Sequence, residues 1–524
     1  MRNPLNKRFT KEIKADIGKY IVLFAFITVM IGFVSGFFVA SESMLVEYEE
    51  GFEKYNIEDG NFEMLMEADE KLFGEMKNIG VNLYENYYVE KNTVNVDSTL
   101  RIFKNREEIN KVCVMEGRLP EKLDEIAIDR LYASNNKIAV GDVLIFEHRE
   151  YNVTGLVALS DYSALYSSPT DLMFDASMFG VGVVTEETFE DIGKGNYHYS
   201  YSWKYDNPPR NEEEEKELAD KVLAVLVKNG MITNFIPQYS NQAIIFAGND
   251  IGSDKNMFQW FLYIVMMIIA FIFAITTSNT INKESAVIGT LRASGYSRGE
   301  IVRHYMAMPV LVTLISAVIG NVLGYTVFKK VVDGMYYSNF SLTTYDTLWN
   351  ANAFVDTTVI PVILMIVINF IVLARKMKLS PMKFLRRDLS TKKKKKALKL
   401  SSKLSIMTRF RLRVIMQNIP NYVTIVVGIF LANIILIFGI ALPALIDNHE
   451  KEVEGNMICD YQYVLKMPAE TTTEGVEKYT VSSLAIYNKN NNKESVSVYG
   501  ISEDSKYVDV DFDGDEVYIS DAFA

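Results

Sequence analysis

The 524-residue chain has few of the residues from which disulfide frameworks and metal centres are built. Its two cysteines, Cys113 and Cys459, lie far apart in the sequence, so no disulfide framework can be inferred from them. The four histidines, at positions 148, 198, 304 and 449, are scattered and show no metal-ligand spacing. No set of nucleophile, base and orienting residue can be assembled either. We therefore predict that this chain has no catalytic activity, no metal site and no cofactor.

Charge is missing from five long apolar stretches. A bilayer core about 30 Å thick is crossed by about 20 apolar residues of helix, and backbone amides inside it must be satisfied within the segment. Buried core helices of a soluble protein are the alternative, but five blocks with charges only at their ends disfavour it. We predict transmembrane helices at residues 20–40, 256–282, 305–328, 357–374 and 421–446.

Lysine and arginine concentrate in segments that flank these stretches. The positive-inside rule places such segments in the cytoplasm. The first stretch follows a basic tail, as a signal peptide does, but its apolar core is longer than the 7–15 residues of a signal, so we interpret it as a retained anchor. The lysine run at 392–396 is better explained by anionic lipid or topology than by nucleic acid, which we do not expect as a partner. The basic segments are residues 1–19, 283–304 and 377–420.

Acidic residues dominate two other segments, 41–255 and 447–524, which we place outside the cell. Lys, Asn, Ile and Tyr are abundant, which suits an AT-rich bacterial genome, and we take the membrane to be a bacterial plasma membrane. Residues 41–255 show a mixed α/β pattern. The five alternating aromatic residues from Tyr197 to Tyr205 indicate a packed sheet face rather than a ligand platform. The expected elements are a strand at 125–129, a helical turn at 129–134, a hairpin at 143–146 and 151–157, and a helix at 212–227 capped by Asn211 and ended by Gly230.

The order of basic segment, span and acidic domain occurs twice along the chain. The string DEIAIDRLYA at 124–133 parallels DEVYISDAFA at 515–524. The second copy ends there, without counterparts of the hairpin or of three further spans. We interpret the chain as a truncated piece of a two-repeat protein of roughly 775 residues and eight spans, with 447–524 an incomplete second domain.

The loop between the second and third spans reads KESAVIGTLRASGYSRGEI, residues 283–301. Residues 284–293 favour a helix, with Val287, Ile288 and Leu291 on one face. Such a short amphipathic helix under the membrane is suited to docking into a groove on a cytoplasmic partner. The alternative is an interfacial helix that rests on lipid.

Two residues at the end of this loop predict where the next helix begins. Gly295 breaks the short helix, and Ser297 with Glu300 forms a capping box that starts the third span. The loop is therefore expected to be a rigid connection between two spans rather than a flexible linker.

This loop resembles the E-x-x-x-I-G-x-L-[KR]-A-x-G signature of FtsX/MacB-type ABC transporter permeases. Residues 380–386 look like the Pro-x-x-x-Leu-Arg element that follows the last span in that family, and 125–157 is similar to a MacB-like core domain. The resemblance implies an α-helical transmembrane bundle plus α/β (α+β) extracellular domains in a multi-pass membrane protein, with an FtsX-like permease domain at 257–376. The matching loop residues are Glu284, Ile288, Gly289, Leu291, Arg292, Ala293 and Gly295.

The family resemblance also implies a function. In such transporters a separate ATPase docks on the cytoplasmic loop and the extracellular domains move in response. MacB carries its own ATPase domain, whereas this chain has no Gly-x-x-x-x-Gly-Lys-Ser/Thr loop. The expected partners are an ABC ATPase, membrane lipid, and an extracellular peptide, lipoprotein, drug or cell-wall hydrolase; the alternative is an ATP-independent sensor or scaffold. The expected ATPase-coupling residues are Glu284, Val287, Ile288, Gly289, Leu291, Arg292, Gly295 and Ile301.

Overall fold

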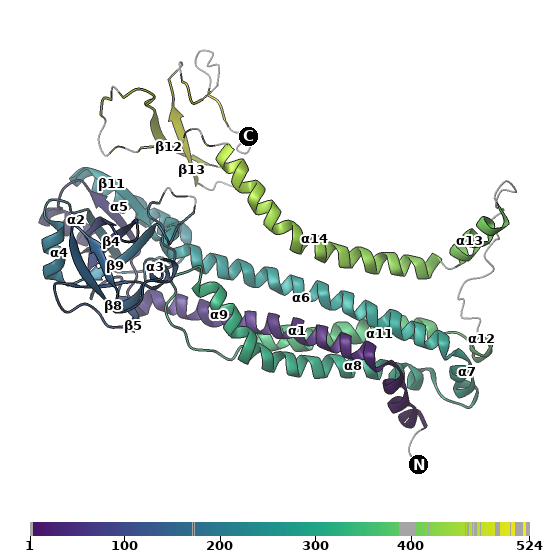
Figure 1. Cartoon of the computed structure of the whole chain (residues 1–524). Coiled ribbons are helices and arrows are strands. Elements are labelled where there is room, and N and C mark those ends of the chain that lie inside the picture. The colour runs from purple at the N-terminus through teal and green to yellow at the C-terminus, as the bar shows by residue number, and fades with distance from the viewer. Residues whose placement is uncertain are drawn as a thin grey trace. The chain divides into compact units, whose positions relative to one another are not determined.

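The computed structural model describes most of the chain, and Figure 1 traces its helices and strands. The contacts divide it into two units, residues 1–428 and 429–524, which are taken separately below. The lysine run at 392–396 and most of 515–524 lie outside the described residues, and 517–519 form no strand, so the inferred repeat stays a prediction. The described residues are 4–169, 171, 173–386, 405–417, 419–455, 473–487, 493–502, 505–508 and 517–519, with shorter pieces between 457 and 471.

Within the described part of the chain, four helical segments are long and apolar enough to cross a membrane. They coincide with the first four predicted spans, and each continues past its apolar run into polar residues. The four segments are Ile17–Lys54, Gln242–Lys283, Arg298–Tyr337 and Ala351–Met377. The helices that form them are α1 (Pro4–Lys54), α6 (Gln242–Lys283), α8 (Arg298–Leu323) with the π-helical turn η2 (Gly324–Phe328) and α9 (Lys329–Tyr337), and α10 (Ala351–Phe354) with the π-helical turn η3 (Val355–Val359) and α11 (Ile360–Met377).

The predicted fifth span lies in α14 (Ile419–Gly455), which follows α13 (Ile406–Gln417). The sequence prediction of a helix is confirmed, while its place in a membrane stays a prediction. In the second unit, β12 (Thr480–Tyr487) and β13 (Lys493–Gly500) form an antiparallel hairpin.

Small residues let α1 approach α8 and η2 closely, which is how helices commonly pack in membranes. A Cβ at Gly36 would lie 2.7 Å from the backbone nitrogen of Lys329, so this contact requires glycine. The side-chain oxygen of Asn321 accepts hydrogen bonds from Ser35 Oγ (2.8 Å) and Thr357 Oγ1 (3.0 Å). Asn321 therefore joins α1, α8 and η3 at one point in the bundle.

An α/β domain lies between α1 and α6. It occupies residues 55–241 and is shorter than the predicted 41–255, because the two helices continue through the ends of that range. Its first sheet is antiparallel, with strand order β11-β1-β10-β2. The strands are β1 (Gly60–Met64), β2 (Val81–Glu85), β10 (Tyr199–Tyr205) and β11 (Ile232–Pro237), and the helices packed on them are α2 (Glu70–Asn78) and α5 (Glu212–Asn229).

The aromatic side chains of β10 form the core of this first sheet. Tyr201, Trp203 and Tyr205 are buried against apolar residues of β1, α2 and α5, which confirms the predicted packed face. The Asn211 side chain accepts a hydrogen bond from the Glu214 backbone nitrogen and caps α5, as predicted. Both features follow from local rules, namely strand alternation and helix capping.

The second sheet has the order β3-β4-β9-β6-β8-β5, with β7 paired to β8. The predicted strand at 125–129 is β6, and the predicted hairpin is β7 with β8, in which Leu144 pairs with Tyr151. Asp129 caps the short helix that follows, as its sequence position suggests. The elements are β3 (Tyr88–Thr93), β4 (Ser98–Lys104), β5 (Val112–Gly117), β6 (Glu125–Asp129), α3 (Arg130–Asn136), β7 (Val143–Phe146), β8 (Arg149–Leu159), β9 (Phe179–Val184) and α4 (Glu186–Gly193).

Buried polar side chains join the two sheets. The Glu58 carboxylate accepts hydrogen bonds from Ser202 Oγ of the first sheet (2.5 Å) and from Asn110 Nδ2 beside the second (2.7 Å). Arg106, which follows β4, forms two hydrogen bonds with the Asp161 carboxylate after β8, at 2.6 and 2.7 Å, and both side chains are about 5% exposed. Arg106 also donates to the side-chain oxygen of Asn86, which follows β2 of the first sheet, at 3.4 Å. Buried polar groups are tolerated when their partners are fixed, so this joint holds the sheets in one arrangement.

Candidate functional site

Helix α7 (Ser285–Ala293) follows α6 almost directly and lies at one end of the helix bundle (Figure 1). It ends at Ala293, two residues before Gly295, whose φ of +99° lies in the left-handed region that favours glycine. The Ser297 hydroxyl then accepts a hydrogen bond from the Glu300 backbone nitrogen, and the Glu300 carboxylate accepts one from the Ser297 nitrogen. The predicted helix, break and capping box are all confirmed.

One face of α7 is buried in an apolar cluster that we call the α7 junction. Ile288 is 0% exposed at its centre, and the predicted residue Ile301 is buried beside it on α8. The junction brings together the ends of three spans with the short helix α12 (Pro381–Leu385). Its buried members are Ile281, Ile288, Ile301, Val302, Tyr305, Leu373, Met377, Leu379 and Phe384.

Glycine at position 289 lets α7 lie directly on α12. A Cβ there would lie 2.9 Å from both the backbone nitrogen and the Cγ atom of Leu385. Any larger residue would force the two helices apart, because a backbone atom cannot move aside as a side chain can. Gly289 therefore sets the spacing between α7 and α12.

Arg292 of α7 and Glu284, the residue just before α7, make hydrogen bonds within the junction. The guanidinium of Arg292 donates to the backbone oxygens of Met377 (3.2 Å) and Leu379, and Glu284 accepts from the Tyr305 hydroxyl at 2.6 Å. Carbonyls at a helix C-terminus carry partial negative charge, so a guanidinium is well placed there. Burial lowers the pKa of Arg292, but arginine remains charged at neutral pH. These residues hold α7 against the spans.

The predicted single apolar face of α7 is wrong in one respect. Ile288 points into the junction, Leu291 is half-buried, and Val287 is 41% exposed on the outer side. Helical spacing places the three side chains within a wide arc of the surface of α7. Packing against α11 and α12 buries only part of that arc, so Ile288 is covered and Val287 is not. Of the eight predicted site residues, Ile288, Gly289 and Ile301 are buried, Glu284, Leu291 and Arg292 are half-buried, and Val287 and Gly295 are exposed.

Sequence reasoning noted residues 380–386 but did not connect them with the loop. In the structure Phe384 of this element is fully buried in the junction, while Met382 and Leu385 are exposed. The sequence did contain a signal for a helix with both a buried and an exposed side. Pro381 begins a helical turn, and the apolar residues at 382, 384 and 385 cannot all face the junction. Exposed basic residues surround this end of the bundle, namely Lys283, Arg298, Arg303, Lys383 and Arg386.

At the other end of the bundle, residues 338–350 between α9 and α10 form a segment that we call the strap. The Arg130 guanidinium of the α/β domain donates to the backbone oxygens of Tyr337 and Phe340, both at 2.8 Å. The Ser341 hydroxyl donates to Asp129. The Ser341 nitrogen donates to the Ser163 oxygen at 2.8 Å. The third and fourth spans are thus tied to the α/β domain, which the sequence did not predict.

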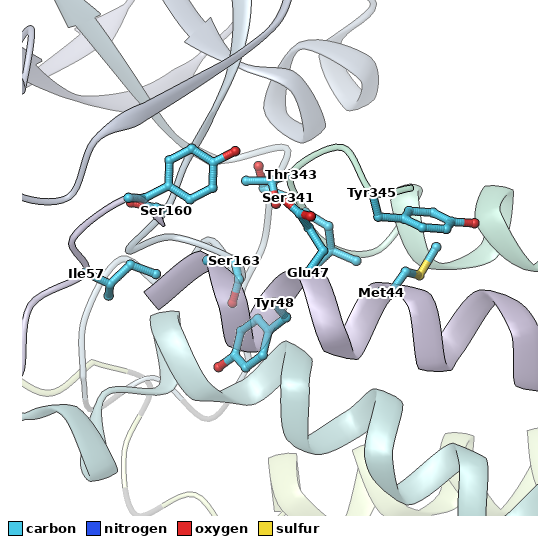
Figure 2. Close-up of a pocket in the computed structure, with 12 residues that line it drawn as sticks. Met44, Glu47, Tyr48, Ile57, Ser160, Ser163, Ser341, Thr343 and Tyr345 are labelled. Atoms are coloured by element: carbon cyan, nitrogen blue, oxygen red, sulfur yellow. The ribbon is translucent and has the colours of Figure 1, made fainter. Parts of the chain in front are cut away.

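A small cavity lies beside the strap, between α1 and the loop that follows β8 (Figure 2). Its volume of about 30 Å³ for a water-sized sphere is enough for roughly two water molecules. The labelled lining includes Glu47 and Tyr48 from α1, Ser160 and Ser163 from the loop after β8, and Tyr345 from the strap. A cavity of this size is too small for an organic ligand.

Asp129 makes the strap contact sensitive to pH. Burial raises the pKa of Asp129 to about 6, although the Ser341 hydroxyl, the nearby Arg130 and two backbone amides oppose the shift. The protonated form is therefore favoured by folding, so this contribution to stability is fully present below about pH 4 and is lost as the pH rises through 6. Asp129→Asn keeps a good helix cap and removes the buried charge.

We therefore expect Asp129→Asn to raise the stability of the full-length protein at pH 7.5, by up to about 3 kcal/mol, and to change it little at pH 4. Thermal unfolding in detergent at both pH values measures the difference. Asp97→Asn, at an exposed turn, is the matched control. A variant less stable than wild type at pH 7.5 would show that the carboxylate stabilises the strap contact.

Comparison with known proteins gives a match for the part of the chain that contains α7. No curated protein matches the chain. Residues 260–381 match the family model described as FtsX-like permease C-terminal, which supports the resemblance stated from the loop signature. The match begins within α6 and ends at the start of α12. The part of the chain that holds the second, third and fourth candidate spans and α7 is therefore similar to the C-terminal domain of FtsX-like permeases.

Proposed function

We propose that this chain is the membrane subunit of an ABC transporter, and that a separate ATPase docks at α7. The observation that carries the proposal is the two-sided environment of α7. One side is buried among residues of α6, α8 and α11, and the other side exposes Val287. A force applied to the exposed side is passed to three helices, because close-packed apolar contacts transmit displacement.

The distribution of charge supports a cytoplasmic location for this end. The exposed residues Lys283, Arg298 and Arg303 flank α7, and basic residues beside spans favour the cytoplasmic side. The N-terminal tail is then also cytoplasmic and the α/β domain extracellular. We retain the bacterial plasma membrane as the location, and the two-repeat plan.

Three connections link the proposed ATPase side with the α/β domain. Helices α1 and α6 run from the bundle into the domain, where Ile57 and Ile244 share one buried cluster. The strap adds a third connection through Arg130 and Ser341. We propose that movement of α7 tilts these connections and so moves the extracellular domain against a peptide, lipoprotein, drug or cell-wall hydrolase.

Co-purification tests the proposal. The full-length protein is expected to retain the ATPase encoded beside it, and Val287→Asp is expected to reduce the affinity by about tenfold or more, since it places a charge in an apolar contact. Val287→Thr, which keeps the shape, is the matched control and should lose much less. Arg292→Glu is less informative, because it also releases α7 from Met377 and Leu379.

Two outcomes would contradict this proposal. If no ATPase is retained by the wild-type protein, the chain acts without this partner, and the ATP-independent sensor or scaffold becomes the better interpretation. If the ATPase binds Val287→Asp as tightly as wild type, it does not dock at α7.

A further inference from the structure

Two of the three tryptophans of the chain are exposed on the helix bundle. Trp260 of α6 is 69% exposed and Trp349, near the end of the strap, is 71% exposed, whereas Trp203 of the α/β domain is fully buried. The indole ring is large and mainly apolar, and tryptophan is highly buried on average. Two rings this open on a membrane protein call for a surface that covers them.

The ring of Trp349 lies against the third and fourth spans. It stacks on Tyr325 of η2, with 5.5 Å between the ring centres, and its centre lies 6.3 Å from that of Phe354 in α10. The backbone nitrogen of the preceding Leu348 donates a hydrogen bond of 3.0 Å to Ser43 Oγ of α1. The end of the strap is thus fixed to the bundle, and Trp349 is held at a defined level along it.

Trp260 lies close to the same level. The Asp356 carboxylate of η3, which follows α10 directly, accepts hydrogen bonds from Gln259 Nε2 (3.0 Å) and from the Tyr263 hydroxyl (2.8 Å) of α6. These two partners lie on either side of Trp260 in the sequence. Helix α6 and the start of the fourth span therefore face each other here, and both tryptophans lie near one level of the bundle.

This level is also where charge begins on the spans. On the side toward α7, the second span has no charged residue from Asn256 to Asn282, and the fourth has none from Thr357 to Ala374. Lys255 precedes the first of these runs, and Lys329 follows the charge-free run of the third span. About 20 residues of helix cross a bilayer core, so a membrane boundary at this level leaves each span the length that it needs. Tryptophan and tyrosine are enriched at such boundaries.

The exposed surface around the two rings continues into the surface of the spans. Ile264 lies one helical turn from Trp260 toward α7 and is 48% exposed, and Val355 and Val359 of the fourth span are exposed beyond Phe354. Exposed aliphatic side chains on a membrane-spanning helix face lipid. We infer that Trp349, together with Trp260, lies in the interfacial layer of the bilayer, so that phospholipid covers the end of the strap.

Charge does not account for this contact. Lys329 and Lys330 near Trp349 are opposed by Asp333 and Asp346, and none of the four is buried. Nearby charges of both signs largely cancel, so attraction to anionic headgroups would be weak. The aromatic ring is then the group that binds the interface, and a zwitterionic bilayer is as good a partner as an anionic one.

The strap is then attached to a different structure at each end. Phe340 and Ser341 hold one end on Arg130 and Asp129 of the α/β domain, and Trp349 holds the other at the membrane surface. A strap fixed in this way sets the spacing between the α/β domain and the bilayer. This inference depends on the position of the spans in a membrane and is independent of the proposed ATPase.

Fluorescence quenching by brominated phosphatidylcholine tests the inference on the full-length protein in nanodiscs. Trp260→Phe leaves Trp349 with Trp203, Trp349→Phe leaves Trp260 with Trp203, and the double replacement leaves Trp203 alone as the baseline. With bromine near the headgroup end of the acyl chains, the emission of Trp349 and that of Trp260 should each fall by about half or more. Bromine at the chain termini should quench both much less, and Trp203 should not be quenched. Unchanged emission from Trp203 shows that each variant is folded.

Four outcomes would count against the inference. If Trp349 is quenched no more than Trp203, the strap does not touch the bilayer, whatever Trp260 shows. If bromine at the chain termini quenches Trp349 more strongly, the ring lies in the hydrocarbon core and its interfacial position is refuted. If Trp349 is quenched only in bilayers that contain phosphatidylglycerol, charge rather than the ring holds the strap. If Trp260 alone escapes quenching, the contact of α6 with the interface is refuted and that of the strap is supported.

Discussion

Replacing Arg106 by alanine is expected to destabilise the α/β domain by about 3–5 kcal/mol. The guanidinium makes two hydrogen bonds to Asp161 and lies 4.6 Å from the centre of the Phe103 ring. Its removal leaves the Asp161 carboxylate buried without a counter-charge at the point where the two sheets meet. A stability of 5–15 kcal/mol is typical for a domain, so a loss of this size would leave little.

Urea unfolding of the full-length protein in detergent, followed by the fluorescence of Trp203 in β10, measures this loss. Trp260 and Trp349 are the other two tryptophans, and phenylalanine at both positions leaves Trp203 as the reporter. Arg149→Ala is the matched control, because its partner Asp191 and Arg149 itself are largely exposed. Exposed ion pairs contribute about 0–1 kcal/mol, so the control should change little.

A double replacement shows which part of the effect belongs to the unpaired charge. Arg106→Met with Asp161→Leu removes both charges and keeps apolar contact with Phe103, and it should recover most of the lost stability. If Arg106→Ala is no more destabilising than Arg149→Ala, the buried pair does not support the joint between the sheets.

Replacing Ile288 by alanine is expected to be the most destabilising change at the α7 junction, the end of the helix bundle away from the α/β domain. Ile288 is fully buried in the α7 junction, and a change from isoleucine to alanine in such a place costs about 2–5 kcal/mol. Because the contacts of Ile288 hold α7 to α8, α11 and α12, the cost should appear as local opening of α7 rather than as global unfolding.

Hydrogen exchange of the backbone amides in α7 measures this opening directly, without reference to any ATPase. In Ile288→Ala the amides of residues 285–293 should exchange much faster than in wild type. Val287→Ala, at the exposed neighbour, should leave the free energy of local opening of α7 unchanged within about 0.5 kcal/mol. If the two variants exchange alike, the junction does not hold α7. If an ATPase docks at α7 as proposed, the same Ile288→Ala protein should still bind it and fail to transmit its movement.

Several elements could be predicted because the information for them is local. The capping of α5 by Asn211 depends on one side chain and two backbone amides, and the break at Gly295 depends on one positive φ. The hairpin of β7 and β8 likewise depends on alternation over a few residues. The first four spans follow from length and hydropathy, which need no partner to be recognised.

Other features were missed because they depend on residues far apart in the sequence. The division of Val287 and Ile288 between surface and core depends on α12, about 90 residues later, lying against Gly289. The contact of Arg130 with the strap depends on residues more than 200 positions away. Periodicity gives the face of a helix but not the element that covers it.

The sequence by itself determined the membrane-crossing helices, the α/β character of the domain between the first two, and the short helix that links the second and third. Each of these depends on hydropathy, alternation or capping within some twenty residues. The tertiary structure alone decided which side of α7 is free, that α12 packs against α7 at Gly289, and that the strap joins the spans to the α/β domain. These arrangements arise from close packing and paired hydrogen bonds between distant segments, and their energies exist only once those segments are in contact.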